Sequence, residues 1–447
     1  MRKASLSTNA LWTSGLYGVR LLLRLGSNIV LSRLLFPEVF GVMALVNSLR
    51  AGAELLSDIG LGQNIIQNRN GADPSFLNTA WTIQIVRGFI LAALFLMVSP
   101  LIDTVYDIPD IGLILMVSSC FFIIGGFQSM NLHVLQKTHR IRDLELYQLI
   151  PDVIGLVLII GLAYYVPSVW TLVLGSIIGV FLRTLSSFMI PGPRPHLTFS
   201  RDRFFEIFSF GKWVFLSSVS FFAATNFDRL YLAKVMPLDV LGIFGVARAL
   251  TDILNGLVTR LTSYIVFPMI AEASHLPMGE LRARILWPRA TFLAIAAILF
   301  GSFLSIVDLI VALLYDPRYS AAEWMVLLLS FGMWLSVLSS FGEAIVTGTG
   351  RPALVSLSSW LKFGFLVVAA PLGFAYFGVV GALVAFSLAD LPRFIAVQLS
   401  QQKLGISFFT QDMLVTCLLV LSVLFGSILR YIVGFGTLLD QFPLTVV

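Results

Sequence analysis

The chain has few of the residues from which soluble enzymes and metal proteins build their sites. Its 447 residues include two cysteines and four histidines, and 12% of them are charged. Both cysteines lie in apolar segments, and the histidines lie in or beside loops at no metal-ligand spacing, so neither a disulfide framework nor a metal site is expected. Gly348–Pro352 lacks the lysine and spacing of a nucleotide-binding loop. No cleavable signal pattern occurs, because Arg20 and Arg24 interrupt the first apolar run.

Apolar residues take up most of the sequence. They make up 58% of it, and the mean hydropathy is +0.93. This composition predicts an all-α polytopic membrane protein. We expect thirteen membrane spans, at residues 10–34, 39–61, 77–101, 111–133, 145–166, 168–190, 206–233, 239–268, 287–314, 320–346, 353–376, 378–399 and 408–432. The tail after Val433 is too short for another span, so either the carboxyl end lies outside or a fourteenth span is missing from this chain.

The basic residues gather in loops between the expected spans. The net charge is +5 and the pI is about 9.3, which in a soluble protein would suggest nucleic acid. With the amino terminus in the cytoplasm, 16 of the 29 basic residues fall in cytoplasmic loops. Arg33, Lys234, Arg318 and Arg430 fall outside. This bias indicates membrane topology rather than nucleic-acid binding, and it predicts a cytoplasmic amino terminus.

One stretch of the first half recurs in the second. Shifting Leu31–Leu49 by 201 residues aligns it with Leu232–Leu250 without a gap, and the glycine of one segment falls on the glycine of the other. Asn47, Arg50, Glu54 and Asp58 share one helix face, because they are spaced three, four and four residues apart. Their counterparts Arg248, Thr251, Asn255 and Thr259 keep that register. The repeat predicts two six-helix lobes as a parallel pseudo-repeat around a central cavity, with a shared site between them.

The lobes are expected at residues 1–192 and 206–403. A basic cytoplasmic linker at 193–205 joins them, and an additional transmembrane helix and tail follow at 404–447. The linker opens with Pro-Gly-Pro and leads into a phenylalanine-rich segment beside arginines. That composition is typical of an amphipathic segment lying on anionic lipid.

Charged residues inside the spans are the candidate functional residues, because charge within a bilayer is costly. In the first span Tyr17, Arg20, Arg24 and Asn28 share a face, with no acid in that span. A guanidinium group matches phosphate oxygens, so this face predicts a phosphate or pyrophosphate site. The alternative is that Arg20 pairs with Glu54 or Asp58 of the next helix.

Arg50 and Arg248 are further candidates for the anion site, with Asn47 beside them. Internal ion pairs with Glu54 and Asp252, each four residues on, are the alternative. The remaining intramembrane polar residues are candidates for ion coupling or for the polar wall of a cavity. The alternative is that they form structural hydrogen bonds or ion pairs at helix ends. They are Glu54, Asp58, Asp228, Arg229, Asp252, Asn255 and Glu343.

The phrase LSRLLFPEVFGVMALV after an arginine-bearing first span, the LQKTHR turn and the TGTGRP turn resemble the polysaccharide transporter family. These are Wzx-type flippases of lipid-linked oligosaccharides within the MOP superfamily. The resemblance implies two lobes arranged as a V around a cavity that opens alternately to each side. It also implies a cationic cavity with arginines on the first, second and eighth helices, which match Arg20 or Arg24, Arg50 and Arg248 here. The possible lack of a fourteenth helix and the balanced charge of the second lobe depart from the family pattern.

We therefore expect a flippase, not an enzyme, that moves a polyprenyl-pyrophosphate-linked oligosaccharide across the bacterial inner membrane for surface polysaccharide biosynthesis. No cofactor is expected, and an H⁺ or Na⁺ gradient or the membrane potential would drive transport. Besides the lipid-linked glycan and the bilayer, expected partners are a polysaccharide polymerase and a chain-length regulator, with the transporter itself a monomer. The alternatives are a cation-coupled exporter of drugs or small solutes and a membrane-embedded glycan-processing enzyme.

Overall fold

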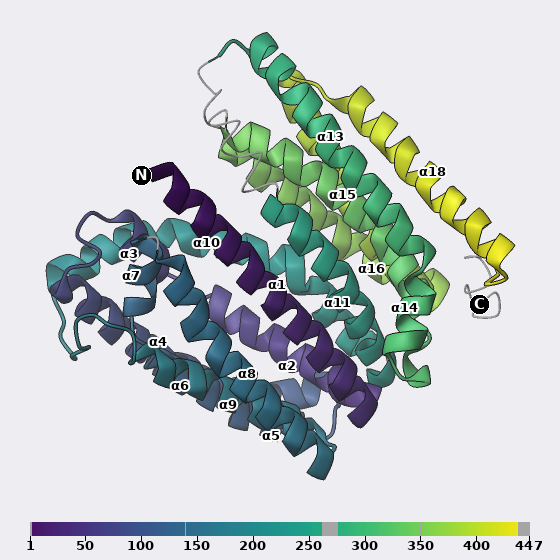
Figure 1. Cartoon of the computed structure of the whole chain (residues 1–447). Coiled ribbons are helices and arrows are strands. Elements are labelled where there is room, and N and C mark those ends of the chain that lie inside the picture. Colours follow the sequence, from purple (N-terminus) through teal and green to yellow (C-terminus); the bar gives the residue numbers. More distant parts are fainter. Residues whose placement is uncertain (1, 139, 262–275, 349–350, 437–447) are drawn as a thin grey trace. The chain divides into compact units, whose positions relative to one another are not determined.

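The computed structural model describes residues 2–138, 140–261, 276–348 and 351–436, and every regular element in these ranges is helical (Figure 1). The predicted all-α polytopic class is confirmed. The first part of the chain holds α1 (Arg2–Leu34), α2 (Pro37–Leu55), α3 (Leu61–Gln67), α4 (Pro74–Tyr106), α5 (Ile111–Ser118), α6 (Cys120–Gly126), α7 (Asn131–Lys137), α8 (Ile141–Tyr165), α9 (Val169–Ser187) and α10 (Arg201–Val235). The second holds α11 (Leu238–Leu261), α13 (Met278–Ser305), α14 (Val307–Leu314), a 3₁₀ turn (Pro317–Tyr319), α15 (Ala322–Gly348), α16 (Pro352–Leu388), α17 (Asp390–Lys403) and α18 (Phe409–Val433).

Within the described residues, each expected span coincides with one helix or with consecutive short ones; the last part of the expected span 239–268 lies outside them. Seven helices of the described chain are long and apolar enough to cross a membrane, or eight if the bent pair Ile111–Gly126 and Asn131–Lys137 is one span. The long helices α1, α2, α10 and α11 coincide with the first and second expected spans of each half.

The chain forms two compact units, and the division falls within α10 and α11 rather than in the linker. Unit 1 comprises residues 1–222 and 229–242, and unit 2 comprises residues 223–228 and 243–447. In unit 1, α8 packs on α1 and α9, α4 packs on α5 and α6, and α2 lies against α9 (Figure 1). Leu61, Ile65, Phe76 and Trp81 are buried in a core that closes one end of this unit.

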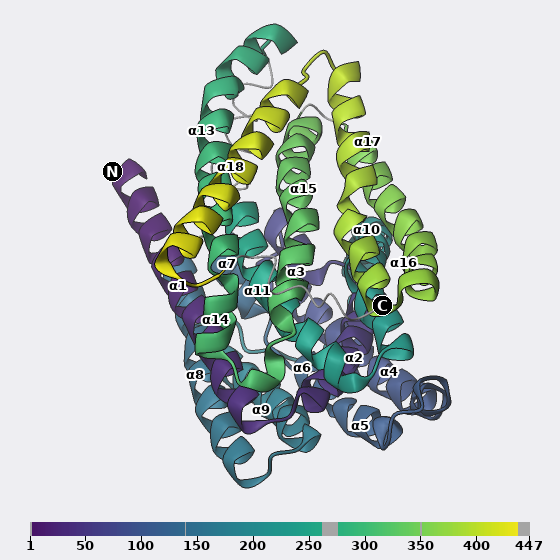
Figure 2. The same ribbon diagram turned by 90° about the vertical axis from the view of Figure 1, so that its right-hand side faces the viewer.

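Unit 2 is built around α15, which packs against α14, α16 and α17. The additional helix α18 runs along α13, as Figure 2 shows, and two buried ion pairs attach it. Arg289 of α13 bonds Asp412, and Arg430 bonds Asp308 of α14 at 2.5 Å. The predicted additional helix is thus an integral part of unit 2.

The helices have two marked breaks, one within the expected span 111–133 and one at an expected boundary between spans. The segment 111–137 bends by 59° between α6 and α7, around Phe127–Met130. The expected boundary between the spans 353–376 and 378–399 lies within α16, where Gly378 has φ +59° and ψ −143°. Positive φ of this kind is accessible to glycine, so Gly378 allows the chain to turn there.

The start of α11 contacts the start of α2 within unit 1, and the contact is reciprocal. A methyl group on Gly41 would collide with the carbonyl oxygen of Leu238, and one on Gly242 would collide with that of Pro37. Both pairs are related by the 201-residue shift of the repeat. Glycine at both places allows the two backbones to approach this closely.

Candidate functional site

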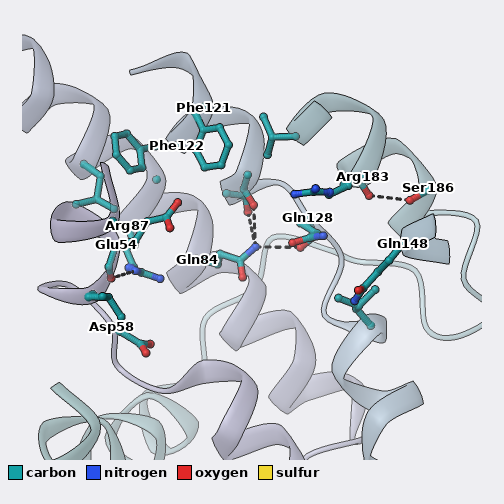
Figure 3. A pocket seen from close by; sticks show the side chains of 18 of the residues that line it. Glu54, Asp58, Gln84, Arg87, Phe121, Phe122, Gln128, Gln148, Arg183 and Ser186 are labelled. Carbon is teal, nitrogen blue, oxygen red and sulfur yellow. Dashed lines mark hydrogen bonds between the residues drawn. The ribbon is translucent and has the colours of Figure 1, made fainter. Parts of the chain in front are cut away.

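Unit 1 encloses a polar cavity of about 730 Å³ between its helices (Figure 3). Its wall combines guanidinium, carboxylate, amide and aromatic side chains with glycine and aliphatic residues. The polar and aromatic members are Arg20, Glu54, Asp58, Gln84, Arg87, Phe121, Phe122, Gln128, Tyr147, Gln148, Arg183 and Ser186. They come from α1, α2, α4, α6, α8 and α9 and from the turns after α2 and α6. A volume of this size is typical of small-molecule sites, which span about 300–1,000 Å³.

Arg20 is fully engaged by α8. Its guanidinium lies 3.2 Å from Glu145 Oε2 and 3.3 Å from Asp152 Oδ2, and it donates to Gln148 Oε1 at 2.7 Å. Arg183 shares Asp152 at 2.8 Å. The alternative in which Arg20 pairs with an acid is therefore the one observed, but with acids of α8 rather than with Glu54 or Asp58.

Arg87 and Arg50 have no carboxylate partner among the described residues. Arg87 donates from Nε to Ser57 Oγ at 2.9 Å and from Nη2 to the main-chain carbonyl of Glu54 at 2.5 Å, which caps the carboxyl end of α2. The cation is favourable there because the helix dipole is negative at this end. The guanidinium carbon of Arg50 lies 3.8 Å from the ring centroid of Phe121, and its Nη1 is buried without a hydrogen bond.

Glu54 and Asp58 face the same cavity without forming an ion pair within the described structure (Figure 3). Asp58 Oδ1 accepts from the main-chain nitrogen of Gly60 at 2.8 Å, which fixes the turn after α2. The alternative of an internal ion pair between Arg50 and Glu54 is thus not observed within hydrogen-bonding distance along the described α2. The main-chain carbonyl of Glu54 instead accepts from Arg87.

Gln84 lines the cavity and connects α4 to the broken span. Its Nε2 donates to the carbonyls of Gly125, Gly126 and Gln128 at 3.1, 3.1 and 3.0 Å (Figure 3). These carbonyls lie at the end of α6 and in the turn that follows, where the regular helical hydrogen bonds stop. Non-helical backbone inside a membrane bundle is tolerated where such side chains satisfy it or where it lines a cavity.

The candidate residues of the second half gather in unit 2 around a small cavity of about 70 Å³, of which Asp228, Arg248, Asp252 and Asn255 are lining residues. Arg248 lies 3.1 Å from both Asp228 and Asp252, so the alternative of an internal pair with Asp252 is the one observed. With two carboxylates bound, this guanidinium is less available to a phosphate than that of Arg50.

Next to this cavity, Lys362, Asp390, Arg393 and Glu343 form a continuous ion-pair chain. Lys362 Nζ donates to Asp390 at 2.7 Å, Arg393 bonds Asp390 at 3.0 Å, and Arg393 also bonds both oxygens of Glu343 at 2.7 Å. Glu343, predicted as a weak coupling candidate, thus has a bidentate partner. Because each charge in this buried network is paired with an opposite charge, its geometry favours a structural role.

Arg24, Asn28, Asn47 and Arg229 are not among the lining residues of either cavity. Arg24 is exposed on α1 and has no ion-pair partner within the described chain, while Asn28 is half-buried. Asn47 is exposed on α2, and Arg229 is half-buried in α10. Tyr17 belongs to α1, but its side chain lies outside the described residues. Their roles in binding stay predictions.

Several cavity residues were not among the sequence candidates. A search for charged residues inside the spans passes over Gln84, Gln128 and Gln148, because they are uncharged. From the sequence, Arg87 and Arg183 are interpreted as arginines whose side chains reach the membrane interface. One signal was present: Glu145, Gln148 and Asp152 follow the three-and-four spacing that singled out the polar face of α2. Applied to α8, that spacing finds the partners of Arg20. Gln128 has no sequence signal, because it lies in the bend between α6 and α7.

Known proteins resemble this chain in sequence. Residues 30–279, more than half of the chain, match the sequence profile of a family described as polysaccharide biosynthesis protein. The chain is 24% identical over 249 residues to the lipopolysaccharide biosynthesis protein WzxC of Escherichia coli (strain K12), covering 54% of this chain and 50% of that protein. It is 25% identical over 281 residues to the amylovoran biosynthesis protein AmsL of Erwinia amylovora, covering 61% and 71%. The match to WzxC thus spans half of that relative's length.

Solved structures share the fold. An inward closed conformation of the lipid II flippase MurJ superposes with a TM-score of 0.70 at 11% identity, covering 96% of this chain and 95% of that one. An inward-facing multidrug resistance MATE family transporter of the MOP superfamily superposes with a TM-score of 0.65 at 15% identity, covering 86% and 94%. The helical arrangement is therefore that of MOP-superfamily transporters, and the predicted family resemblance is confirmed. The chain belongs to the polysaccharide biosynthesis protein family matched by residues 30–279.

Proposed function

We propose that the protein is a flippase that moves a polyprenyl-pyrophosphate-linked oligosaccharide from the cytoplasmic to the outer leaflet of the bacterial inner membrane. The observation that carries this proposal is the polar cavity of unit 1, beside which Arg50 and Arg87 keep guanidinium groups without carboxylate partners in the described chain. A membrane protein rarely holds such groups inside its bundle unless a ligand or water meets them.

The chemistry of the guanidinium group supports a phosphate ligand. Arginine offers up to five donors in a planar fork, which suits the oxygens of a pyrophosphate. The buried Nη1 of Arg50 lacks an acceptor, and an unsatisfied buried donor costs about 1–3 kcal/mol. Binding of an anion would remove this penalty. The names of the relatives, which include polysaccharide biosynthesis proteins and a lipid II flippase, are consistent with such cargo.

A cation-coupled exporter of drugs or small solutes is the second candidate. The carboxylates of Glu54 and Asp58 favour it, because they face the same cavity without an ion pair within the described residues. Such an exporter would bind cationic cargo at these acids, and its expression would confer drug resistance without restoring a surface glycan. A glycan-processing enzyme would instead form product in detergent solution.

We extend the flippase proposal to the orientation of the chain, its energy source and its partner proteins. The amino terminus lies in the cytoplasm, an H⁺ or Na⁺ gradient or the membrane potential drives transport, and the monomer works beside a polymerase and a chain-length regulator. The basic residues in the expected cytoplasmic loops support this orientation.

The test is glycan export by a strain whose own flippase gene is deleted. We expect the wild-type chain to restore surface polysaccharide and to lower the pool of lipid-linked oligosaccharide in the cytoplasmic leaflet. Arg50→Ala and Arg87→Ala should each reduce export at least tenfold, because each removes a charged donor worth about 1.5–3 kcal/mol. Arg87 lines the cavity, and Arg50 lies against Phe121 of the cavity wall. Arg140→Ala, which removes an exposed arginine outside the cavity lining, is the matched control.

Membrane levels of each variant are measured in parallel. Full export by both Arg50→Ala and Arg87→Ala at normal protein levels would contradict the assignment of the anion site. Failure of the wild-type chain to export glycan, together with gained drug resistance, would favour the exporter.

A further inference from the structure

We propose that Gln84, Gln128 and Gln148 form an amide subsite in the cavity of unit 1 that binds hydroxyl groups of the glycan. The inference rests on the proposed flippase function and deepens it, because it assigns recognition of the sugar to residues other than the arginines. The three side chains come from α4, from the bend after α6 and from α8, and Figure 3 shows them around one space.

The orientation of Gln84 is fixed by its partners. All three atoms around its Nε2 are main-chain carbonyl oxygens, which only accept, so the nitrogen must be the atom that faces them. Oε1 then remains as an acceptor with no donor among the described residues. The bend of the span thus leaves one acceptor of a lining residue unused.

The orientation of Gln148 follows in the same way. A guanidinium group only donates, so the atom that meets Arg20 at 2.7 Å must be Oε1. Nε2 therefore remains as a donor at the cavity wall. Gln128 uses its main-chain carbonyl to bind Gln84, while its side-chain amide has no hydrogen-bond partner in the described structure.

The three amides together leave both donors and acceptors unused. A sugar hydroxyl also donates and accepts, whereas a phosphate accepts and an organic cation donates or carries no hydrogen at all. Polar atoms inside a membrane bundle are costly unless something bonds to them. A neutral ligand rich in hydroxyl groups satisfies this set, and the cavity of about 730 Å³ has room for it.

The test measures binding of two probes to the purified full-length protein in nanodiscs. One probe is the lipid-linked oligosaccharide extracted from the source strain after deletion of this gene, and the other is sugar-free undecaprenyl pyrophosphate. We expect the wild type to bind the glycan-bearing lipid more tightly. Gln128→Leu and Gln148→Leu should each weaken that binding by about three- to tenfold, the effect of one or two neutral hydrogen bonds, and leave sugar-free binding unchanged.

Gln136→Leu, at an exposed position of α7, is the matched control and should bind both probes as the wild type does. Equal binding of the glycan-bearing lipid by the wild type, Gln128→Leu and Gln148→Leu would overturn the amide subsite and leave the flippase standing. Loss of both probes in a variant that remains folded would overturn it too, because the effect would then not concern the sugar. No binding of either probe by the wild type would instead remove the proposed function.

Discussion

At the scale of single residues, four arginines near the cavity of unit 1 have four different surroundings. Arg20 is bound by two carboxylates, Arg183 by one, Arg87 by a hydroxyl and a main-chain carbonyl, and Arg50 by an aromatic ring. Spacing along α1 and α2 predicted that Arg20 and Arg50 face inward. It did not predict the partners, because these come from α8 for Arg20 and from α6 for Arg50.

The ion pair between Arg20 and Glu145 connects α1 to α8, the helix on which α1 mainly packs. A double-mutant cycle with Arg20→Ala, Glu145→Ala and the double variant should give a coupling energy of about 1–2 kcal/mol, because the two groups are partly shielded from solvent. Thermal unfolding in detergent measures it. The exposed pair Arg140 and Asp143 should couple by about 0.5 kcal/mol or less. Additive effects at Arg20 and Glu145 would show that the pair does not anchor α1.

At the scale of helices, the break between α6 and α7 does more than the regular segments to shape the cavity of unit 1. The bend after α6 exposes carbonyls that Gln84 binds, and it brings Gln128 to the cavity. Hydropathy predicts one uninterrupted span at residues 111–133, since most of the segment is apolar. The bend depends on a partner from α4, so no local pattern announces it.

Helix α18 is attached by charge at both ends, and this attachment can be tested at Asp412. Removing one partner of a buried ion pair leaves an uncompensated charge, so Asp412→Ala should lower the free energy of unfolding by about 3–5 kcal/mol. Thermal unfolding in detergent checks this. The double variant Arg289→Met, Asp412→Leu should recover most of the loss, because no isolated charge remains. A double variant as unstable as Asp412→Ala would mean that the pair contributes more than charge balance.

At the scale of the whole molecule, the repeat is the main organising feature. The shift of 201 residues, found in the sequence, relates the two glycines that meet at the starts of α2 and α11. This relation is expected if the two halves share one pattern.

The reciprocal glycine contact gives a prediction for the whole fold. Gly41→Leu and Gly242→Leu should each reduce the amount of folded protein in the membrane to a similar extent, because each side chain would meet the equivalent backbone carbonyl. Size-exclusion chromatography of the detergent extract measures folded protein. Gly245→Leu, at a position with open space around it, is the control. A large effect at one of the paired glycines alone would argue against a symmetric contact.

The sequence by itself determined the all-α membrane class and predicted spans and a repeat, because apolar length and helical spacing are properties of one segment in a lipid environment. It also identified the family. Only the tertiary structure decided which arginines are neutralised and where the amides gather. Those outcomes depend on side chains brought together from separate helices, such as Arg20 with Glu145 and Gln84 with Gly125. Spacing along one helix specifies a face, but the partner of that face is set by packing.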